Sequence, residues 1–387
     1  MRNNNIITFV YASCLMSKPT LEKAFNEFPE NIGLEVQKYH RLIVEGLVAN
    51  NVDVKAISFQ PGLEYLNNSP EIENFDGVEY NYLKSKKKHF SHIDIARKSY
   101  KLTKEILKNN KQSYVICDVL NYSVSLGAVL AAKKMKAKSI GIITDFPEGS
   151  HAKGSIKIPL TWNLIKKFDS YVVLTKQMLQ KLNGKKKSVV LEGQADINFP
   201  QNINPEDKKY EDFVCLYAGS VHERYGIKAL IDGFLKANIP NSRMIVFGGG
   251  DYAECLKKIN DKRIDYRGIQ PNEVVLKEEQ KATLLINPRP TDADYVLYSF
   301  PSKTIEYMTT GTPVLTTKLA GIPEEYYDYI YFFDGFDSDN ISNKIKEMSS
   351  YDKEELFNKG RAAKNFVLKQ KNNVIQAGKI VEMVTKL

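Results

Sequence analysis

Cysteine and histidine are scarce in this chain, and neither is clustered. Four cysteines (Cys14, Cys117, Cys215 and Cys255) and five histidines occur among 387 residues, with no CxxC pair and no Cys/His cluster. This spacing argues against a zinc site and against a disulfide framework. Three of the cysteines sit beside apolar residues, which favours buried free thiols.

Long apolar runs are also missing. No run approaches the ~18 residues that a membrane-spanning helix needs. The chain begins with one arginine, three asparagines and a short apolar run over residues 6–12, without a clear small-residue cleavage site. We interpret this start as a first buried strand and not as an export signal, and we expect a cytoplasmic protein.

The motifs of nucleic-acid and dinucleotide binding are absent as well. The net charge is +9, but no zinc-finger, RNP or basic-zipper pattern accompanies it, so no nucleic acid is expected. The glycine run 248–250 follows a predicted strand, yet Asp251 and Tyr252 lead directly into a helix, so GxGxxG is not formed. Lysines gather at 84–88, 133–138 and 185–187, where an anionic membrane surface, an anionic substrate or simple solvation could each account for them.

What the sequence does contain is a repeated alternation of short β-branched runs with amphipathic helical patterns. Strands are expected at 6–11, 52–58, 114–117, 139–144 and 170–174, with helices at 36–49, 93–107 and 124–134 between them. A Pro-, Asn- and Asp-rich stretch at 191–210 is typical of a linker, after which the alternation restarts and continues to residue 316. The rhythm predicts an α/β protein with two doubly wound, Rossmann-like domains, which would face a cleft.

Two glycine turns in the second half are candidates for phosphate binding. Gly219 and Ser220 form a turn between a predicted strand and a helix that starts near Gly226, and Arg224 would add a fork of donors suited to a diphosphate. Gly249, in the second turn, permits close backbone approach.

The segment 299–315 is the third candidate. Pro301 fits the first turn of a helix over 303–309, which Ser299 or Ser302 could cap. Lys303 and Glu306 are three residues apart and therefore share a helical face. A phosphate at the helix start would meet Lys303, and a carboxylate one turn deeper could accept hydrogen bonds from vicinal ribose hydroxyls.

The order of these segments resembles the retaining glycosyltransferases of the GT-B fold, specifically the large family-four group, also called glycosyltransferases group 1. The resemblance is good over residues 213–323 and covers the N-terminal half only in outline. It implies an acceptor-binding domain at 1–195, a nucleotide-sugar-binding domain at 196–365, and a C-terminal helix at 366–387 that crosses back to the first domain. It also implies a UDP-sugar donor, favoured over a GDP-sugar, and neither a metal nor a cofactor; the Asp-x-Asp motif Asp292-Ala293-Asp294 belongs to the donor loop and is not expected to bind a metal.

The chain departs from the family pattern at three places. Glu306 matches the second of the family's two glutamates, but the first falls on Tyr298. The usual Gly-Arg turn is Gly219-Ser220, and the usual lysine before the helix glycine is Tyr225. We therefore expect a variant subgroup, marked by SFPSK, in which other cations bind the diphosphate.

Residue roles follow from the resemblance and from these departures. Asp145 follows a predicted strand and should face the cleft, whereas Asp118 and Asn121, after another strand, are more typical of a cap or turn. The expected catalytic residues are Asp145, Arg224 and Lys303. The expected donor-binding residues are Gly219, Ser220, Arg224, Gly249, Arg289, Ser302, Lys303 and Glu306.

The predicted function is transfer of a sugar from a nucleotide-diphosphate sugar to a saccharide or lipid-linked saccharide acceptor, in bacterial cell-surface polysaccharide synthesis. The basic clusters would suit peripheral docking at the inner face of the plasma membrane. Two alternatives stay open: a non-catalytic nucleotide-sugar-binding partner subunit, and a GT-B-fold sugar-nucleotide epimerase. A dinucleotide oxidoreductase is disfavoured by the missing GxGxxG motif.

Overall fold

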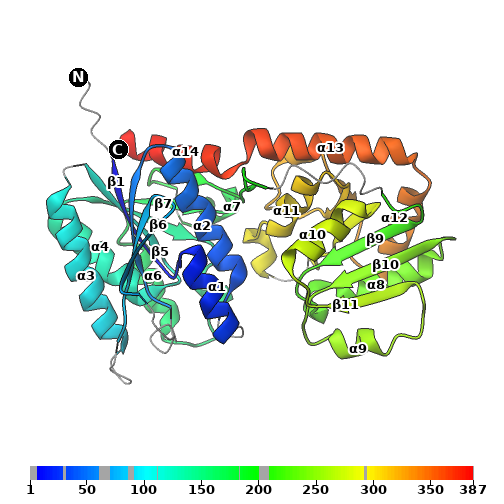
Figure 1. Cartoon of the computed structure of the whole chain (residues 1–387), viewed down its shortest axis with the longest axis horizontal. Coiled ribbons are helices and arrows are strands. Elements are labelled where there is room, and N and C mark those ends of the chain that lie inside the picture. Colours follow the sequence, from blue (N-terminus) through cyan, green and yellow to red (C-terminus); the bar gives the residue numbers. More distant parts are fainter. Residues whose placement is uncertain are drawn as a thin grey trace. The chain divides into compact units, whose positions relative to one another are not determined.

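The computed structural model describes residues 7–28, 32–60, 70–85, 91–110, 112–182, 184–199, 209–291 and 294–386. The lysines at 86–88, much of the predicted linker and the Asp292-Ala293 pair lie outside the described residues. The chain forms two compact units, an N-terminal unit of Met1–Gln194 with Asn373–Leu387 and a C-terminal unit of Ala195–Asn372 (Figure 1).

The N-terminal unit is built on an eight-stranded sheet with the order β3-β4-β2-β1-β5-β6-β7-β8. All neighbours pair in parallel except β3 and β4, which are antiparallel. Every residue of β1 is buried, as expected for a central strand of a parallel sheet covered on both faces. The strands are β1 (Thr8–Ser13), β2 (Asp53–Ser58), β3 (Ile72–Phe75), β4 (Val78–Tyr82), β5 (Ser113–Asp118), β6 (Lys138–Ile143), β7 (Ser170–Val173) and β8 (Ser188–Val190).

Helices cover this sheet and complete its core. The helix α14 packs against α2, and its Ala377, Ile380 and Val384 join the apolar cluster that contains the β1 residues Phe9 and Tyr11. The helices α3 and α4 pack along each other. The helices of the unit are α1 (Lys18–Glu27), α2 (Leu34–Ala49), α3 (Ser91–Asn109), α4 (Tyr122–Met135), α5 (Pro147–Ser150), α6 (Lys157–Ile165), α7 (Lys176–Lys181) and α14 (Asn373–Thr385).

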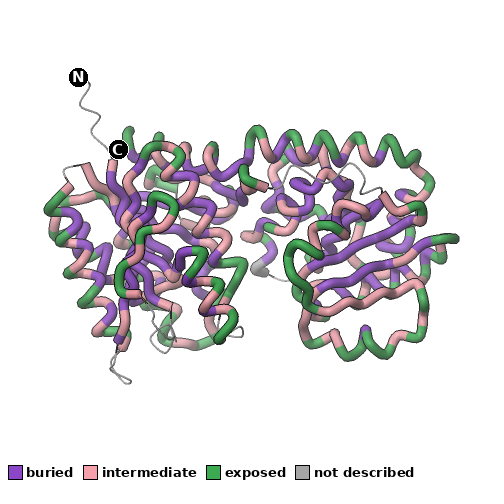
Figure 2. Tube along the Cα trace, viewed as in Figure 1, coloured by how far each residue is buried: buried purple, intermediate pink, exposed green. Residues whose placement is uncertain are grey.

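The C-terminal unit is built on a six-stranded parallel sheet with the order β11-β10-β9-β12-β13-β14. Renumbered along the unit, this is the doubly wound order 3-2-1-4-5-6, whose topological switch point lies between β9 and β12. The strands are β9 (Phe213–Ala218), β10 (Ser242–Phe247), β11 (Ile264–Gly268), β12 (Leu284–Asn287), β13 (Val314–Thr317) and β14 (Tyr331–Phe333). In Figure 2 the central strands of this sheet are buried, whereas several of the helices around it include exposed residues.

The helices of the C-terminal unit lie on the two faces of its sheet and form two apolar clusters with it. The α-helices are α8 (Ile227–Ala237), α9 (Ala253–Lys257), α10 (Asn272–Lys281), α11 (Ser302–Thr310), α12 (Ser338–Ser349) and α13 (Lys353–Gln370). Short 3-10 helices are η3 (Glu223–Tyr225), η4 (Asp294–Tyr298) and η5 (Glu324–Tyr326). Within the described part of the chain, none of the helices is both long and apolar enough to pass through a lipid bilayer.

The predicted α/β architecture with two parallel-sheet domains is confirmed. The prediction of one continuous helix near the C-terminus was wrong, because α13 ends at Gln370 and α14 begins at Asn373. Residues between these helices pair with a distant segment: the Ala195 N–H donates to the Lys371 carbonyl at 2.8 Å, and Ala195 forms a parallel bridge with Asn372. The chain returns to the N-terminal unit at this break.

Candidate functional site

The candidate site in the C-terminal unit begins where β9 and β12 separate. These strands pair only at Cys215 and Leu216 of β9, so the last residues of β9 lie beyond the shared ladder. The loop after β9 and the loop after β12 both start at this edge. In doubly wound sheets, ligands bind beyond the carboxyl ends of the strands at such a switch point.

Tyr307 of α11 fixes the end of β9. Its hydroxyl accepts a hydrogen bond from the Ala218 N–H at 2.8 Å and donates one to the Ala218 carbonyl at 3.1 Å. The Tyr307 side chain is fully buried, and burial holds the pKa of its phenol well above the usual range. Tyr307 therefore takes the place of the missing strand partner and ties α11 to the residue before Gly219.

The two glycine turns pack backbone to backbone. A Cβ at Gly248 would lie 1.8 Å from the Gly219 carbonyl oxygen, and one at Gly250 would lie 2.1 Å from the Val221 carbonyl oxygen. The Val221 N–H donates to the Gly249 carbonyl at 2.8 Å, which holds the turns in register. Both glycines also have positive φ, so only glycine fits there without strain.

A carboxylate bridges the same two turns. Asp251 accepts a hydrogen bond from the Glu223 N–H at 3.1 Å, and its other oxygen lies 3.1 Å from Nδ1 of His222. Hydrogen bonding from His222, followed by that from Glu223, lowers the pKa of the exposed Asp251 carboxyl. Sequence reasoning noted Asp251 only as the residue that interrupts a dinucleotide motif.

Two arginines meet on the ring of Tyr225. The guanidinium carbon of Arg224 lies 4.8 Å from the ring centroid, and that of Arg289, which follows β12, lies 4.5 Å from it. Arg224 also donates from Nη2 to the Tyr225 hydroxyl at 3.1 Å. The Arg289 N–H donates to Oγ1 of Thr317 at 2.9 Å, which anchors its backbone. Tyr225 stands where the glycosyltransferase family that the sequence resembles usually has a lysine. Its ring thus contacts two cations at the switch point.

The helix α11 carries the other predicted donor-binding residues. Lys303 and Glu306 form an ion pair with 2.7 Å between Nζ and Oε2, and both are about one-quarter exposed. Ser302 is exposed at the first helical position. The prediction that Ser299 or Ser302 caps the helix was wrong: Pro301 is the N-cap, no side chain caps it, and the Pro301 carbonyl accepts from the Thr304 N–H at 2.8 Å.

Asp145 belongs to the N-terminal unit, two residues beyond the end of β6. The residue is exposed, yet desolvation by the surrounding protein raises the pKa of its carboxyl to about 6. A carboxyl with this pKa changes charge close to neutral pH, as is common in functional sites.

Sequence reasoning missed a buried polar network at the switch point of the N-terminal sheet. The Tyr11 hydroxyl lies 2.7 Å from Nδ1 of His40, whose Nε2 lies 3.3 Å from Oδ2 of Asp118. Cys14 completes a group whose Cys, His and Asp ligand atoms lie within 4.8 Å of one another. Burial and the nearby Asp118 raise the pKa of the Cys14 thiol to about 12, and both imidazole nitrogens already have partners, so the group fits a hydrogen-bonded network better than a metal site.

The structure thus distributes the predicted residues over three places. Around the C-terminal switch point lie the two glycine turns, Arg224 and Arg289; on α11 lie Ser302, Lys303 and Glu306; Asp145 lies in the other unit. Asp118 makes a turn contact, accepting from the Leu120 N–H at 3.0 Å.

Comparisons with known proteins agree with this geometry. Residues 198–365 match the model of a family described as glycosyl transferases group 1. A comparison of the sequence with curated proteins gives no match.

Solved structures similar to this one are GT-B glycosyltransferases at low sequence identity. Anabaena Alr3699/HepE in complex with UDP has a TM-score of 0.65 at 14% identity, over 99% of this chain and 100% of that chain. A glycosyltransferase from Rickettsia africae ESF-5 has a TM-score of 0.68 at 14% identity, over 99% of this chain and 98% of that one. Sucrose-phosphate synthase from Thermosynechococcus elongatus has a TM-score of 0.67 at 14% identity, over 98% of both chains.

Proposed function

The chain is a glycosyltransferase of the GT-B fold with a glycosyl transferases group 1 domain at residues 198–365, and on that premise we propose its reaction. It transfers a sugar from a UDP-sugar to a saccharide or lipid-linked saccharide, with retention of anomeric configuration. The acceptor belongs to cell-surface polysaccharide synthesis in a bacterium. The protein works at the inner face of the plasma membrane without spanning it.

The observation that carries this proposal is the pair of arginines on Tyr225. Arg224 and Arg289 come from the loops after β9 and β12, the strands that flank the switch point, and both stack on one ring. Departure of a nucleoside diphosphate leaves negative charge on its phosphates, and preorganised cations lower the energy of that state. Guanidinium forks match phosphate oxygens, so two of them suit a diphosphate.

The helix α11 supplies the proposed contact with the ribose of the nucleotide. In our proposal the Glu306 carboxylate accepts hydrogen bonds from the ribose hydroxyls, and Lys303 contributes to phosphate binding. Their ion pair at 2.7 Å holds both side chains on one face of the helix. The Tyr307 hydroxyl, on the next residue, fixes that helix to the end of β9.

The N-terminal unit provides the acceptor side in this proposal. Asp145 accepts a hydrogen bond from the reacting acceptor hydroxyl and orients it. The pKa of about 6 for this carboxyl means that it is mostly ionised at pH 7 and able to accept. The acceptor oxygen bonds to the anomeric carbon on the same face from which the diphosphate leaves, so retention needs no carboxylate nucleophile. The leaving phosphate takes the acceptor's proton, so no separate general base is needed.

Bound ligands in similar structures support the choice of UDP. Alr3699/HepE has been solved with UDP and with UDP-glucose. Another similar structure is the lipopolysaccharide outer core galactosyltransferase WaaB, with a TM-score of 0.63 at 16% identity over 98% of this chain and 99% of that chain. The second supports an acceptor of the cell-surface saccharide class.

A thermal-shift titration tests the donor assignment. UDP should raise the melting temperature more than GDP does, because a ligand that binds only the native state stabilises it by mass action. The Glu306→Ala variant should abolish the UDP shift. Glu254→Ala is a matched control, since Glu254 also forms an i,i+3 ion pair with a lysine, at 2.6 Å, in the same unit. An unchanged shift in Glu306→Ala would refute the ribose contact.

Product analysis tests the reaction. Incubation with a UDP-sugar and candidate saccharides should release UDP, and NMR of the product should show the anomeric configuration of the donor. UDP binding without turnover over a broad acceptor panel would favour a non-catalytic partner subunit. An epimerised sugar formed without any acceptor would favour a sugar-nucleotide epimerase.

A further inference from the structure

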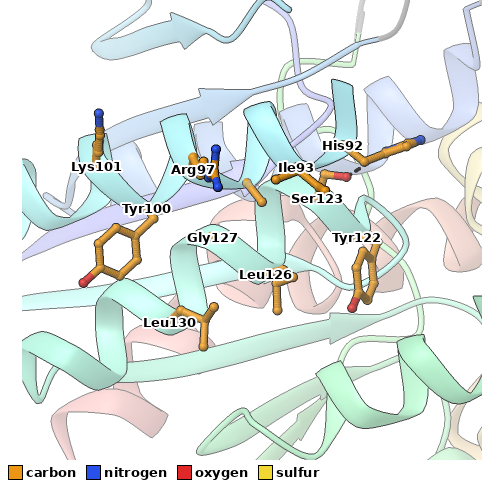
Figure 3. A pocket seen from close by; sticks show the side chains of 11 residues that line it. His92, Ile93, Arg97, Tyr100, Lys101, Tyr122, Ser123, Leu126, Gly127 and Leu130 are labelled. Carbon is orange, nitrogen blue, oxygen red and sulfur yellow. Dashed lines mark hydrogen bonds between the residues drawn. The ribbon is translucent and has the colours of Figure 1, made fainter. Parts of the chain in front are cut away.

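The N-terminal unit has an open apolar groove that the proposed reaction does not use. It lies between α3 and α4, has a volume of about 400 Å³, and its walls are almost entirely apolar (Figure 3). From α3 it is lined by His92, Ile93, Ala96, Arg97, Tyr100 and Lys101. From α4 it is lined by Tyr122, Ser123, Leu126, Gly127 and Leu130.

The groove is a rigid product of how these helices pack. They run in the same direction and touch at Gly127, where a Cβ would lie only 2.2 Å from the Ala96 carbonyl oxygen. At one end the His92 ring meets the Ser123 hydroxyl, with 2.8 Å between Nδ1 and Oγ. Because a small residue lets the backbones approach, the larger side chains before and after it form the two walls.

The rim of the groove exposes large apolar side chains. Ile93 of α3 is 53% exposed and Leu130 of α4 is 41% exposed. Figure 3 shows Tyr100, Leu126 and Leu130 along the groove. Apolar atoms gathered into an open groove mark a binding surface more often than scattered single residues do.

Basic residues surround this apolar groove. Across α3 and α4 there are seven basic and two acidic residues, and α4 has no acidic residue. Arg97, Lys101, Lys104 and Lys108 follow one another at helical spacing along α3, and Lys101 extends from the groove rim in Figure 3.

The two acidic residues leave α3 and α4 with a net charge of about +5, since seven basic residues oppose them. Asp94 is held by the Ser85 hydroxyl at 2.9 Å and by Lys98 at 3.2 Å. Among the described residues, no acidic side chain pairs with Arg97, Lys101, Lys133 or Lys134.

We propose that the α3–α4 face docks on a bilayer that contains anionic lipid, with Ile93, Leu130 and the groove in the interfacial region and the lysines and arginine at the headgroup phosphates. An apolar groove flanked by basic residues complements an anionic lipid, which has both an apolar and a negatively charged part. Each basic side chain near the bilayer surface adds to the attraction. Nucleic acid would match the charge but not the apolar walls, because phosphate contacts dominate its binding. The inference rests on the proposed function, since a lipid-linked acceptor would be presented at that surface.

Vesicle co-sedimentation with the full-length protein tests the proposal. The wild type should bind vesicles of phosphatidylcholine mixed with phosphatidylglycerol, and should bind pure phosphatidylcholine vesicles at least about tenfold less, with strong weakening by salt. Lys133→Glu with Lys134→Glu should reduce binding to the mixed vesicles by about tenfold or more, because the charge near the lipid is reversed. Lys258→Glu with Lys262→Glu is the matched control, since these exposed lysines lie in the C-terminal unit and carry the same charge change.

A second variant tests the apolar contribution. Ile93→Ser with Leu130→Ser should also weaken vesicle binding by about tenfold, and circular dichroism should show an unchanged fold because both side chains are already exposed. Equal binding to both vesicle types, or equal losses in the Lys133/Lys134 and Lys258/Lys262 variants, would overturn the proposal. So would tight binding to duplex DNA without binding to vesicles.

The thermal shift with UDP keeps the two proposals separate. Vesicle binding without a UDP shift would remove the proposed function and leave the docking surface in place. A UDP shift and transfer to a water-soluble acceptor, with no vesicle binding, would overturn only the docking surface.

Discussion

The hydroxyl of Tyr307 offers the sharpest test of how the candidate site is held. Tyr307→Phe removes one oxygen atom and no apolar volume. The hydroxyl makes two hydrogen bonds to Ala218, at 2.8 and 3.1 Å, in a place where both residues are almost completely buried. Since β12 pairs with β9 only at Cys215 and Leu216, no strand is present to replace these bonds.

The magnitude follows from the two polar groups that lose their partner. A buried N–H or C=O left unsatisfied costs about 1–3 kcal/mol, so the loss of partners for both groups in Tyr307→Phe should lower the free energy of unfolding of the C-terminal unit by about 2–6 kcal/mol. The space left by one oxygen is too small to admit a water molecule, so solvent does not restore the hydrogen bonds. Amide exchange should accelerate at Gly219 and Ser220, because the strand end that carries them is no longer tied to α11.

Urea unfolding followed by far-ultraviolet circular dichroism is the assay. The single tryptophan, Trp162, lies in α6 of the N-terminal unit, so its fluorescence follows that unit separately. The expected result is a lower urea midpoint for the C-terminal unit. This unit accounts for the part of the dichroism change that does not follow Trp162 fluorescence. Tyr331→Phe is the control, because its hydroxyl has no hydrogen-bond partner among the described residues and it lies in the same unit. A loss in Tyr307→Phe no larger than about 0.5 kcal/mol would refute the reasoning, since that is the usual range for neutral surface changes.

Three further predictions concern charge. Tyr225→Leu should raise the dissociation constant for UDP by about five- to thirtyfold in calorimetry, because two cation–π contacts of about 0.5–1 kcal/mol each orient the arginines, whereas Tyr225→Phe should stay near wild type. Transferase activity should rise with pH through about 6 as the Asp145 carboxyl ionises, and Asp145→Asn should lose this limb of the pH–rate profile; a profile that Asp145→Asn leaves unchanged would contradict the assignment. Burial, with a smaller contribution from Arg361, lowers the pKa of Lys209 to about 7, so the unfolded state binds more protons between pH 7 and the ordinary lysine pKa. Unfolding free energy should therefore rise by about 2 kcal/mol from pH 7 to pH 9 relative to Lys209→Met, and parallel curves for the two proteins would argue against it.

Periodicity predicted the elements that surround the site well. The helix expected to start near Gly226 is α8, which begins at Ile227, and α11 extends the expected 303–309 by one residue at each end. These segments have strong apolar periodicity and clear glycine boundaries, so local sequence is enough to define them. The antiparallel β3–β4 hairpin was not predicted, because half of the residues of its edge strand β3 are exposed and none is buried.

The contacts that fix the site were beyond sequence reasoning for a physical reason. The hydrogen bonds from Tyr307 to Ala218 join residues 89 positions apart and end on backbone atoms, which leave no pattern in side-chain type. Tyr225 was identified as a departure from the family, but its gathering of Arg224 and Arg289 depends on two loops that meet only in the folded sheet. The sequence showed that Asp251 interrupts the glycine motif. It did not show that the Asp251 carboxylate forms hydrogen bonds with the neighbouring turn.

The break between α13 and α14 has a consequence for the order in which the protein is made. All described strands of the N-terminal sheet have been synthesised by Val190, yet α14, whose Ala377 and Ile380 complete that unit's core, is made only after the whole C-terminal unit. At translation rates of about 5–20 residues per second, the ribosome needs roughly 10–40 s to make the chain between them. During that interval the C-terminal unit is itself being made, while the apolar face of the first unit that α14 will cover stays exposed to solvent and to chaperones.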